Sequence, residues 1–138
     1  MVKFIKPGLL AGVVLLIISV IFSPILVALI PSLGVEYSNY NIFRSWQDPL
    51  ISLYFVYPFV LGLVLSWVWT KVKKVIPGKT SSQKVSNFAI GYWLIAGLPG
   101  MLITYASFQV SLALVMSWSL SGLIDAYVAS YVINRFSK

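Results

Sequence analysis

The chain has 138 residues, of which 59% are hydrophobic and only 9% are charged. Soluble domains carry about 25% charged residues, so this composition excludes a surface that faces mainly water. The sequence contains no cysteine and no histidine, which excludes disulfides, thiol chemistry, imidazole catalysis and the ligands of haem, iron–sulfur clusters and ordinary zinc sites. We therefore predict no cofactor, no metal site and no enzymatic activity.

The net charge of +7 is confined to short segments of the chain. Every basic residue except Arg44 falls within residues 3–6, 71–84 or 135–138. Because no soluble module is expected to present these residues, nucleic acid is not a predicted partner. Basic clusters between hydrophobic runs are instead typical of the cytoplasmic loops of membrane proteins.

The first hydrophobic run predicts a transmembrane helix over residues 8–31. It is longer than the core of a signal peptide, and no convincing cleavage site follows it. A polar and aromatic connection is expected over 32–49, where aromatic residues recur at intervals of three: Tyr37, Tyr40, Phe43 and Trp46. Either a helical turn at the lipid–water interface or an irregular loop with aromatic anchors accounts for this spacing.

The second span is predicted over residues 50–70, because Asp48-Pro49 combines a good N-cap with a proline at the first helical position. A basic loop is expected over 71–85, with a turn at Pro77-Gly78. Ser86 or Asn87 is expected to cap a third span over 87–106. After a short connection, the fourth span is predicted over 109–133.

Four spans would place the amino terminus, the 71–85 loop and the carboxyl terminus on one side of the membrane. That side carries nearly all of the basic residues, whereas the other carries Glu36, Arg44 and Asp48. The positive-inside rule then predicts that both termini are cytoplasmic. The predicted fold is an all-α integral membrane protein of the plasma membrane. It forms a single domain over residues 1–138, with four transmembrane helices arranged as two hairpins.

Asp125 is the one ionisable residue inside a predicted span. An Asp at the centre of a membrane helix costs about 2.5–3.5 kcal/mol on insertion scales, so a polar environment is expected around it. On a helical wheel it shares a face with small and polar residues, which gives a candidate intramembrane polar site of Asp125, Ser121, Ser111 and Trp118. A structural hydrogen-bonding role is favoured over a proton- or cation-binding role, because no second ionisable residue lies in a span.

Small residues at intervals of four predict faces on which helices approach closely. They are Gly8, Gly12, Gly62, Ser66, Ala96, Gly100, Gly122 and Ala126. Contacts within the chain are expected first, and contacts between copies second. Pro24, Pro58 and Pro99 are expected to bend three spans at similar depth, which either shapes the bundle or opens a shallow outward vestibule.

The remaining aromatic residues predict belts at the two membrane interfaces, with Tyr92 near the inner one and Tyr57 near the outer one. The lysines of the basic loop are predicted to contact anionic lipid headgroups on the cytoplasmic side, at about 1 kcal/mol each. They are Lys71, Lys73, Lys74, Lys79 and Lys84. A topology signal alone, or a docking site for an acidic partner, would use the same lysines.

The leading functional hypothesis is a structural or accessory membrane protein that packs against itself or against a larger membrane complex. The alternative is a small transporter or channel in which Asp125 binds a proton or a cation. An enzyme acting on lipid would need Glu36, Arg44 and Asp48 at the outer interface, and their spacing matches no catalytic motif.

Overall fold

The computed structural model describes residues 3–137, and every regular element among them is helical. Four helical segments are long and apolar enough to cross a membrane: Ile5–Leu29, Pro49–Val72, Ser81–Ser107 and Leu112–Phe136. The all-helical fold with four candidate spans is therefore confirmed. Lys138, which belongs to the third basic segment, lies outside the described residues.

The first span is helix α1 (Ile5–Leu29), which runs through Pro24 and ends at Ile30. A short helix α2 (Pro31–Tyr37) follows at once, with proline at its first position. Residues 38–48 contain no regular helix. Of the aromatic residues spaced at intervals of three, only Tyr37 is helical, so the series does not form one helical stripe and the connection over residues 38–48 is irregular.

The second span starts with a 3-10 turn, η1 (Pro49–Ser52), and continues as α3 (Leu53–Val72). The Oδ1 atom of Asp48 accepts a hydrogen bond from the backbone N–H of Leu50 at 2.9 Å, which confirms the predicted cap. The chain after α3 turns at residues 73–75, before the predicted turn at Pro77-Gly78, and Gly78 adopts a φ of 146° that side chains disfavour.

The third span begins at Ser81, six residues before the predicted start. Its cap is Thr80, not Ser86 or Asn87. The backbone N–H of Gln83 donates to Thr80 Oγ1 at 3.2 Å, and Gln83 Oε1 accepts from the N–H of Thr80 at 3.3 Å. This reciprocal arrangement is a capping box, and its sequence signature of threonine followed three residues later by glutamine was present in the chain.

The third span consists of α4 (Ser81–Tyr92), a π-helical turn η2 (Trp93–Gly97) and α5 (Leu98–Ser107). Pro99 has no N–H to continue the α-helical hydrogen bonds, and the turn before it is wider than an α-helical turn. In this turn the N–H of Leu98 bonds to the carbonyl of Trp93, five residues earlier. The Trp93 ring lies where a Cβ on Gly97 would be only 2.8 Å away. From there the indole N–H donates to the Ser119 carbonyl at 2.9 Å and ties η2 to the fourth span.

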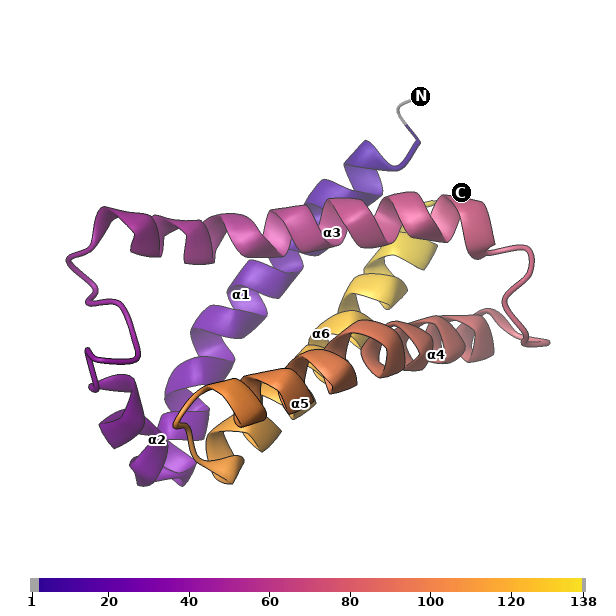
Figure 1. Ribbon diagram of the computed structural model, residues 1–138. Helices are drawn as coiled ribbons and strands as arrows, with labels where there is room; N and C mark the ends of the chain where they lie inside the picture. The colour runs from indigo at the N-terminus through magenta and orange to yellow at the C-terminus, as the bar shows by residue number, and fades with distance from the viewer. Residues whose placement is uncertain (1–2, 138) are drawn as a thin grey trace.

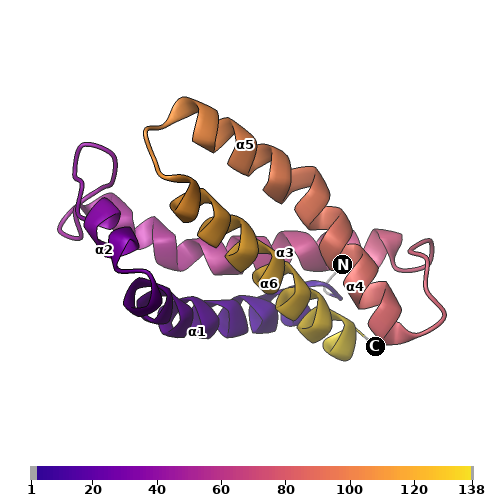
Figure 2. The same cartoon turned by 90° about the horizontal axis from the view of Figure 1, so that it is seen from below.

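The fourth span is α6 (Leu112–Phe136), which starts after Ser111. It packs on α4, η2 and α5, whereas α1 packs along α3, and α1 and α6 pack against each other between these two pairs. Figure 1 shows α3 along the top and the α4–α5 segment below it, and Figure 2 shows the α4–α5 segment and α1 along opposite sides. Each span of a pair therefore lies next to its neighbour in sequence.

The two ends of the bundle differ in charge. In both views, the chain ends and the connection from α3 to α4 lie at one end, whereas α2 and the connection from α5 to α6 lie at the other. We call the first the basic end, because it holds Lys3, Lys6, the lysines of 71–84 and Arg135. We call the second the opposite end, and it holds Glu36, Arg44 and Asp48.

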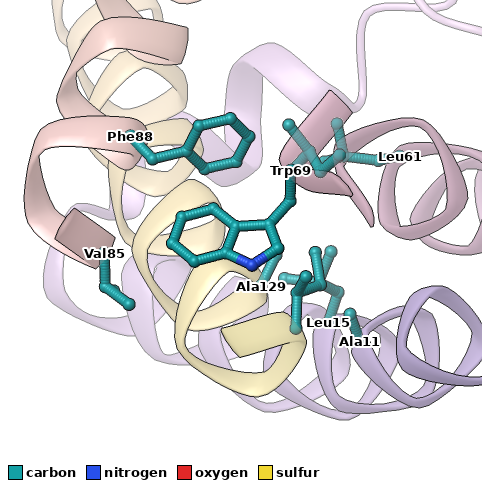
Figure 3. Close-up of a cluster of buried hydrophobic side chains, with 9 residues drawn as sticks. Ala11, Leu15, Leu61, Trp69, Val85, Phe88 and Ala129 are labelled. Atoms are coloured by element: carbon teal, nitrogen blue, oxygen red, sulfur yellow. The ribbon is translucent and has the colours of Figure 1, made fainter. Parts of the chain in front are cut away.

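Each end has its own buried apolar cluster. At the basic end, Trp69 lies among side chains from all four spans, and its ring meets Phe88 edge-on with 5.1 Å between centroids (Figure 3). At the opposite end, the buried residues are Leu33, Val110, Leu114 and Val115. Most other large apolar side chains are exposed, as expected for helices that face lipid.

The α1 and α3 backbones approach closely through glycine. A Cβ on Gly12 would lie 2.8 Å from Phe59 Cα, and one on Gly62 would lie 2.8 Å from the backbone nitrogen of Gly12. Gly8 lies in the same contact, and Ser66 Oγ donates to the carbonyl of Phe4 at 2.8 Å. The small residues predicted in the first two spans therefore lie in one helix–helix contact.

The predicted small residues of the last two spans behave differently. A Cβ on Gly100 or on Gly122 would meet no atom within 4 Å, apart from its own helix and chain neighbours. Ala96 is exposed, and only Ala126 is fully buried. Within the described chain, Gly100, Gly122 and Ala96 therefore make no close contact with another helix, and contacts of these positions with another copy stay a prediction.

Candidate functional site

Asp125 lies near the middle of α6, with its side chain partly buried. Within residues 3–137 its carboxyl group receives no hydrogen bond, and the single ion pair of this part of the chain is Arg44–Asp48. Ser137 Oγ is the one fully buried, unpartnered polar side-chain atom among these residues. The Asp125 oxygens are therefore not sealed inside the bundle and retain contact with the surroundings.

Two tyrosines from other helices lie near Asp125. The phenols of Tyr57 in α3 and Tyr92 in α4 are within Coulombic range of its carboxyl group and of each other. Tyr57 is 57% exposed. The sequence had placed these two residues in belts at opposite membrane interfaces, because nothing in their local pattern indicates that α3 and α4 bring them to one carboxylate.

Ser121 lies one turn before Asp125 on α6 and is partly buried. The other two residues of the predicted polar site lie at the opposite end. Ser111 is the N-cap of α6, where its Oγ accepts from the N–H of Leu114 at 3.1 Å. Trp118 donates its indole N–H to the hydroxyl of Tyr37 at 2.7 Å. Ser111 and Trp118 therefore bond away from Asp125, and of the predicted polar site only Ser121 lies one turn from it.

A second polar arrangement joins the α1–α3 connection to the start of α6. Glu36 Oε2 accepts a hydrogen bond from the backbone N–H of Ser111 at 3.0 Å, where the helix dipole favours a negative charge. The rings of Tyr37, Phe43 and Trp118 lie together, with centroids 5.4–6.4 Å apart. Burial raises the pKa of the Tyr37 phenol, against a smaller opposing effect of the Trp118 hydrogen bond. These contacts fasten the connection to the bundle.

Arg44 and Asp48 form an exposed ion pair with 2.7 Å between Nη1 and Oδ2. The backbone N–H of Leu50 and then the Arg44 side chain lower the pKa of the Asp48 carboxyl. Glu36, Arg44 and Asp48 thus stabilise helix starts and a loop and do not converge on one site. No group of three potential metal-binding residues occurs among residues 3–137.

The five lysines of residues 71–84 differ in their contacts. Lys84 Nζ donates to the carbonyl of Lys73 at 3.3 Å, and Lys73 Nζ donates to the carbonyl of Ser137 at 3.4 Å. Lys71 lies over the ring of Trp67, 6.0 Å from its centroid. Lys74 and Lys79 are exposed. The predicted headgroup lysines therefore include two that cover the carboxyl ends of helices.

A partly open cavity of about 440 Å³ lies at the basic end, where α3 and α6 end and α4 begins. The cavity is lined by Trp69, Lys73, Ser81, Asn134, Arg135 and Ser137. The amide Nδ2 of Asn134 donates to Ser81 Oγ at 2.8 Å and joins α6 to the start of α4. Sequence spacing gave no signal for this site, because its residues come from three separate segments.

Comparison of the chain with protein-family models, with curated proteins and with solved structures finds no match.

Proposed function

We propose that this protein is a non-catalytic subunit of a membrane assembly, and that a transmembrane helix of its partner lies beside Asp125. The observation that supports this proposal is the Asp125 carboxyl group, which is partly exposed in mid-span and has no hydrogen-bond partner within residues 3–137. Facing lipid, such a group costs about 2.5–3.5 kcal/mol. A hydrogen-bond donor on a neighbouring helix offsets that cost.

The arrangement of the helices favours a lateral partner. In Figure 1, α3 lies along the top and the α4–α5 segment below it, and α3 does not pack extensively on η2 or α5. Tyr57 is exposed and Asp125 is partly exposed. A Cβ on Gly122, one turn before Asp125, would meet no atom of another helix within 4 Å in the described chain. A small residue next to a polar one is typical of contacts between membrane helices.

The charge distribution supports an orientation with both termini in the cytoplasm, at the inner face of the plasma membrane. Among the described residues the basic end carries no acidic side chain, whereas the opposite end carries Glu36, Arg44 and Asp48. Cytoplasmic segments of membrane proteins are enriched in Lys and Arg. Charge reporters fused after Ser137 and within residues 38–48 should therefore report opposite sides of the membrane.

Photocrosslinking in intact membranes tests the lateral partner. A photoreactive residue at Val60 of α3, one turn from Tyr57, should form a crosslink to another polypeptide. The same residue at Ile17 of α1 is the matched control, because the two positions are 52% and 54% exposed. Asp125→Ala should abolish the crosslink at Val60. A monomer without crosslinks after gentle solubilisation would contradict the proposal.

A second candidate function is proton- or cation-coupled transport. It is supported by the presence of more than one polar group near Asp125, namely the phenols of Tyr57 and Tyr92 and the hydroxyl of Ser121. Purified protein in liposomes would then carry a proton or cation flux that Asp125→Asn abolishes and Glu36→Gln preserves. Flux that persists in Asp125→Asn would reject this role for the carboxylate.

A further inference from the structure

We propose that the cavity at the basic end binds the phosphate of an anionic lipid headgroup or of a soluble phosphate compound. This inference goes beyond the accessory function, because the cavity contains none of the residues around Asp125. It is lined by two cationic side chains, Lys73 and Arg135, from two different helices. No acidic side chain of the sequence lies near it, since Glu36 and Asp48 belong to the opposite end and Asp125 to mid-span.

An unpartnered polar group at the cavity indicates that it is built for a ligand. Ser137 lines the cavity, and its Oγ is the one fully buried side-chain polar atom of residues 3–137 that has no hydrogen-bond partner. A buried polar group without a hydrogen bond is destabilising and is rare in native proteins. A phosphate oxygen would accept from this hydroxyl.

The neighbouring backbone suits an anion as well. Ser81 is the first residue of α4, and the amino end of a helix carries partial positive charge. The carboxyl ends of α3 and α6 carry the opposite charge, but Lys84 and Lys73 already donate to carbonyls there. Arg135 has no ion-pair partner among residues 3–137, and its planar guanidinium matches the geometry of a phosphate.

Size and position favour a headgroup. The volume of about 440 Å³ lies within the range of roughly 300–1,000 Å³ that small-molecule sites occupy, so there is room beyond the phosphate itself. The cavity lies where membrane-spanning helices end, which is the level of the lipid headgroups. A lipid phosphate would enter through the open side while its acyl chains remain beside the exposed apolar faces of the helices.

Thermal unfolding of the purified full chain, with phosphatidic acid or phosphatidylcholine added in detergent, tests the site. Phosphatidic acid should raise the unfolding temperature and phosphatidylcholine should not. In Lys73→Gln/Arg135→Gln the affinity for phosphatidic acid should fall by at least about tenfold, because charge-assisted hydrogen bonds are lost. The matched control is Lys74→Gln/Lys79→Gln, which removes the same charge outside the cavity and should change affinity by less than about threefold.

Ser137→Ala separates binding from folding. Removing an unpartnered buried hydroxyl should leave the ligand-free protein at least as stable, while the affinity for phosphatidic acid falls by about threefold or more, as expected for one lost hydrogen bond. Equal losses in the two charge-matched double variants, or unchanged affinity in Ser137→Ala, would overturn the proposal. So would the absence of any stabilisation by phosphatidic acid and by inorganic phosphate.

Inorganic phosphate, compared with chloride at equal ionic strength, distinguishes the source of the ligand. Stabilisation by phosphatidic acid alone identifies a lipid headgroup. Equal stabilisation by inorganic phosphate identifies a soluble phosphate compound, provided that Lys73→Gln/Arg135→Gln abolishes it. Loss of crosslinking at Val60 would leave these results unchanged, so the phosphate site and the lateral partner fail or stand separately.

Discussion

The two ends of the bundle are held together by different interactions. Toward the basic end, α1 and α3 meet backbone to backbone through Gly8, Gly12 and Gly62, beside an apolar cluster centred on Trp69. At the opposite end, polar atoms of the α1–α3 connection reach α6 through the hydrogen bonds of Glu36 with Ser111 and of Tyr37 with Trp118. One end depends on close approach, and the other on specific hydrogen bonds.

This difference shows when a pattern of small residues becomes a contact. Gly62 faces Gly8 and Gly12, so neither backbone is held away by a side chain. Gly122 belongs to an equally regular series on α6, but no helix faces it within the described chain. Since lipid provides no hydrophobic force between helices, a small residue draws two helices together only where the facing helix also presents a small surface.

The largest expected effect of a single substitution is at Gly62. Gly62→Ala places a Cβ against the Gly8 carbonyl and 2.8 Å from the Gly12 nitrogen, and overpacking of this kind lowers the free energy of unfolding by about 1–3 kcal/mol. Gly122→Ala is the matched control and should raise it by about 0.5–1 kcal/mol through helix propensity. Equilibrium unfolding in detergent measures both.

Equal effects at these two positions would show that the close approach of α1 and α3 contributes nothing special to stability. In native membranes Gly122→Ala has a second use, because a partner helix at Asp125 would pack against this position. Weaker crosslinking at Val60 in Gly122→Ala, without any loss of stability of the isolated chain, would strengthen the proposal of a lateral partner.

A smaller effect is expected at the opposite end. Tyr37→Phe removes the acceptor of the Trp118 indole N–H, and one such hydrogen bond contributes about 1 kcal/mol to the free energy of unfolding. A double-mutant cycle with Trp118→Phe should recover most of this value as coupling. Tyr40→Phe is the control, since Tyr40 is 67% exposed. Zero coupling would mean that the hydrogen bond does not fasten the connection.

The smallest effect is expected from the cap of η1. The pKa of the Asp48 carboxyl is lowered by the Leu50 N–H and by Arg44, so its stabilising contribution is present above the unfolded-state pKa of about 4 and is lost as the pH falls below it. Asp48→Asn keeps a good N-cap but removes this titration. The difference in unfolding temperature between wild type and Asp48→Asn should therefore shrink below about pH 4; a constant difference would contradict the assignment.

Local signals in the sequence predicted local structure well. The cap at Asp48-Pro49 depends only on neighbouring residues, and the structure contains it. Gly78 adopts a positive φ that favours glycine, although the turn itself lies at residues 73–75. The start of the third helix was misplaced although its signal, Thr80 followed by Gln83, lies in the sequence. Residues 81–84 are all polar and the first apolar residue is Val85, so the hydrophobic pattern gives no sign of a helix that begins at Ser81.

Contacts between distant segments were harder to predict. A helical wheel placed Ser111 and Trp118 on the face of Asp125, but it carries no information on what faces that helix at each level. Ser111 and Trp118 bond to the α1–α3 connection, whereas Tyr57 and Tyr92 lie near Asp125 instead. The cavity at the basic end likewise gathers residues from three segments, so no single stretch of sequence could have indicated it.

The sequence by itself determined the class of the protein, its four membrane-length helices and the concentration of basic residues at loops, because these depend on composition, length and local pattern. Only the tertiary structure decided which glycines meet, which side chains of other helices lie near Asp125 and where Lys73 and Arg135 line a common cavity. The physical reason is that helices in lipid are laterally free, so their pairing follows from shape and from a few polar contacts that a linear pattern does not contain.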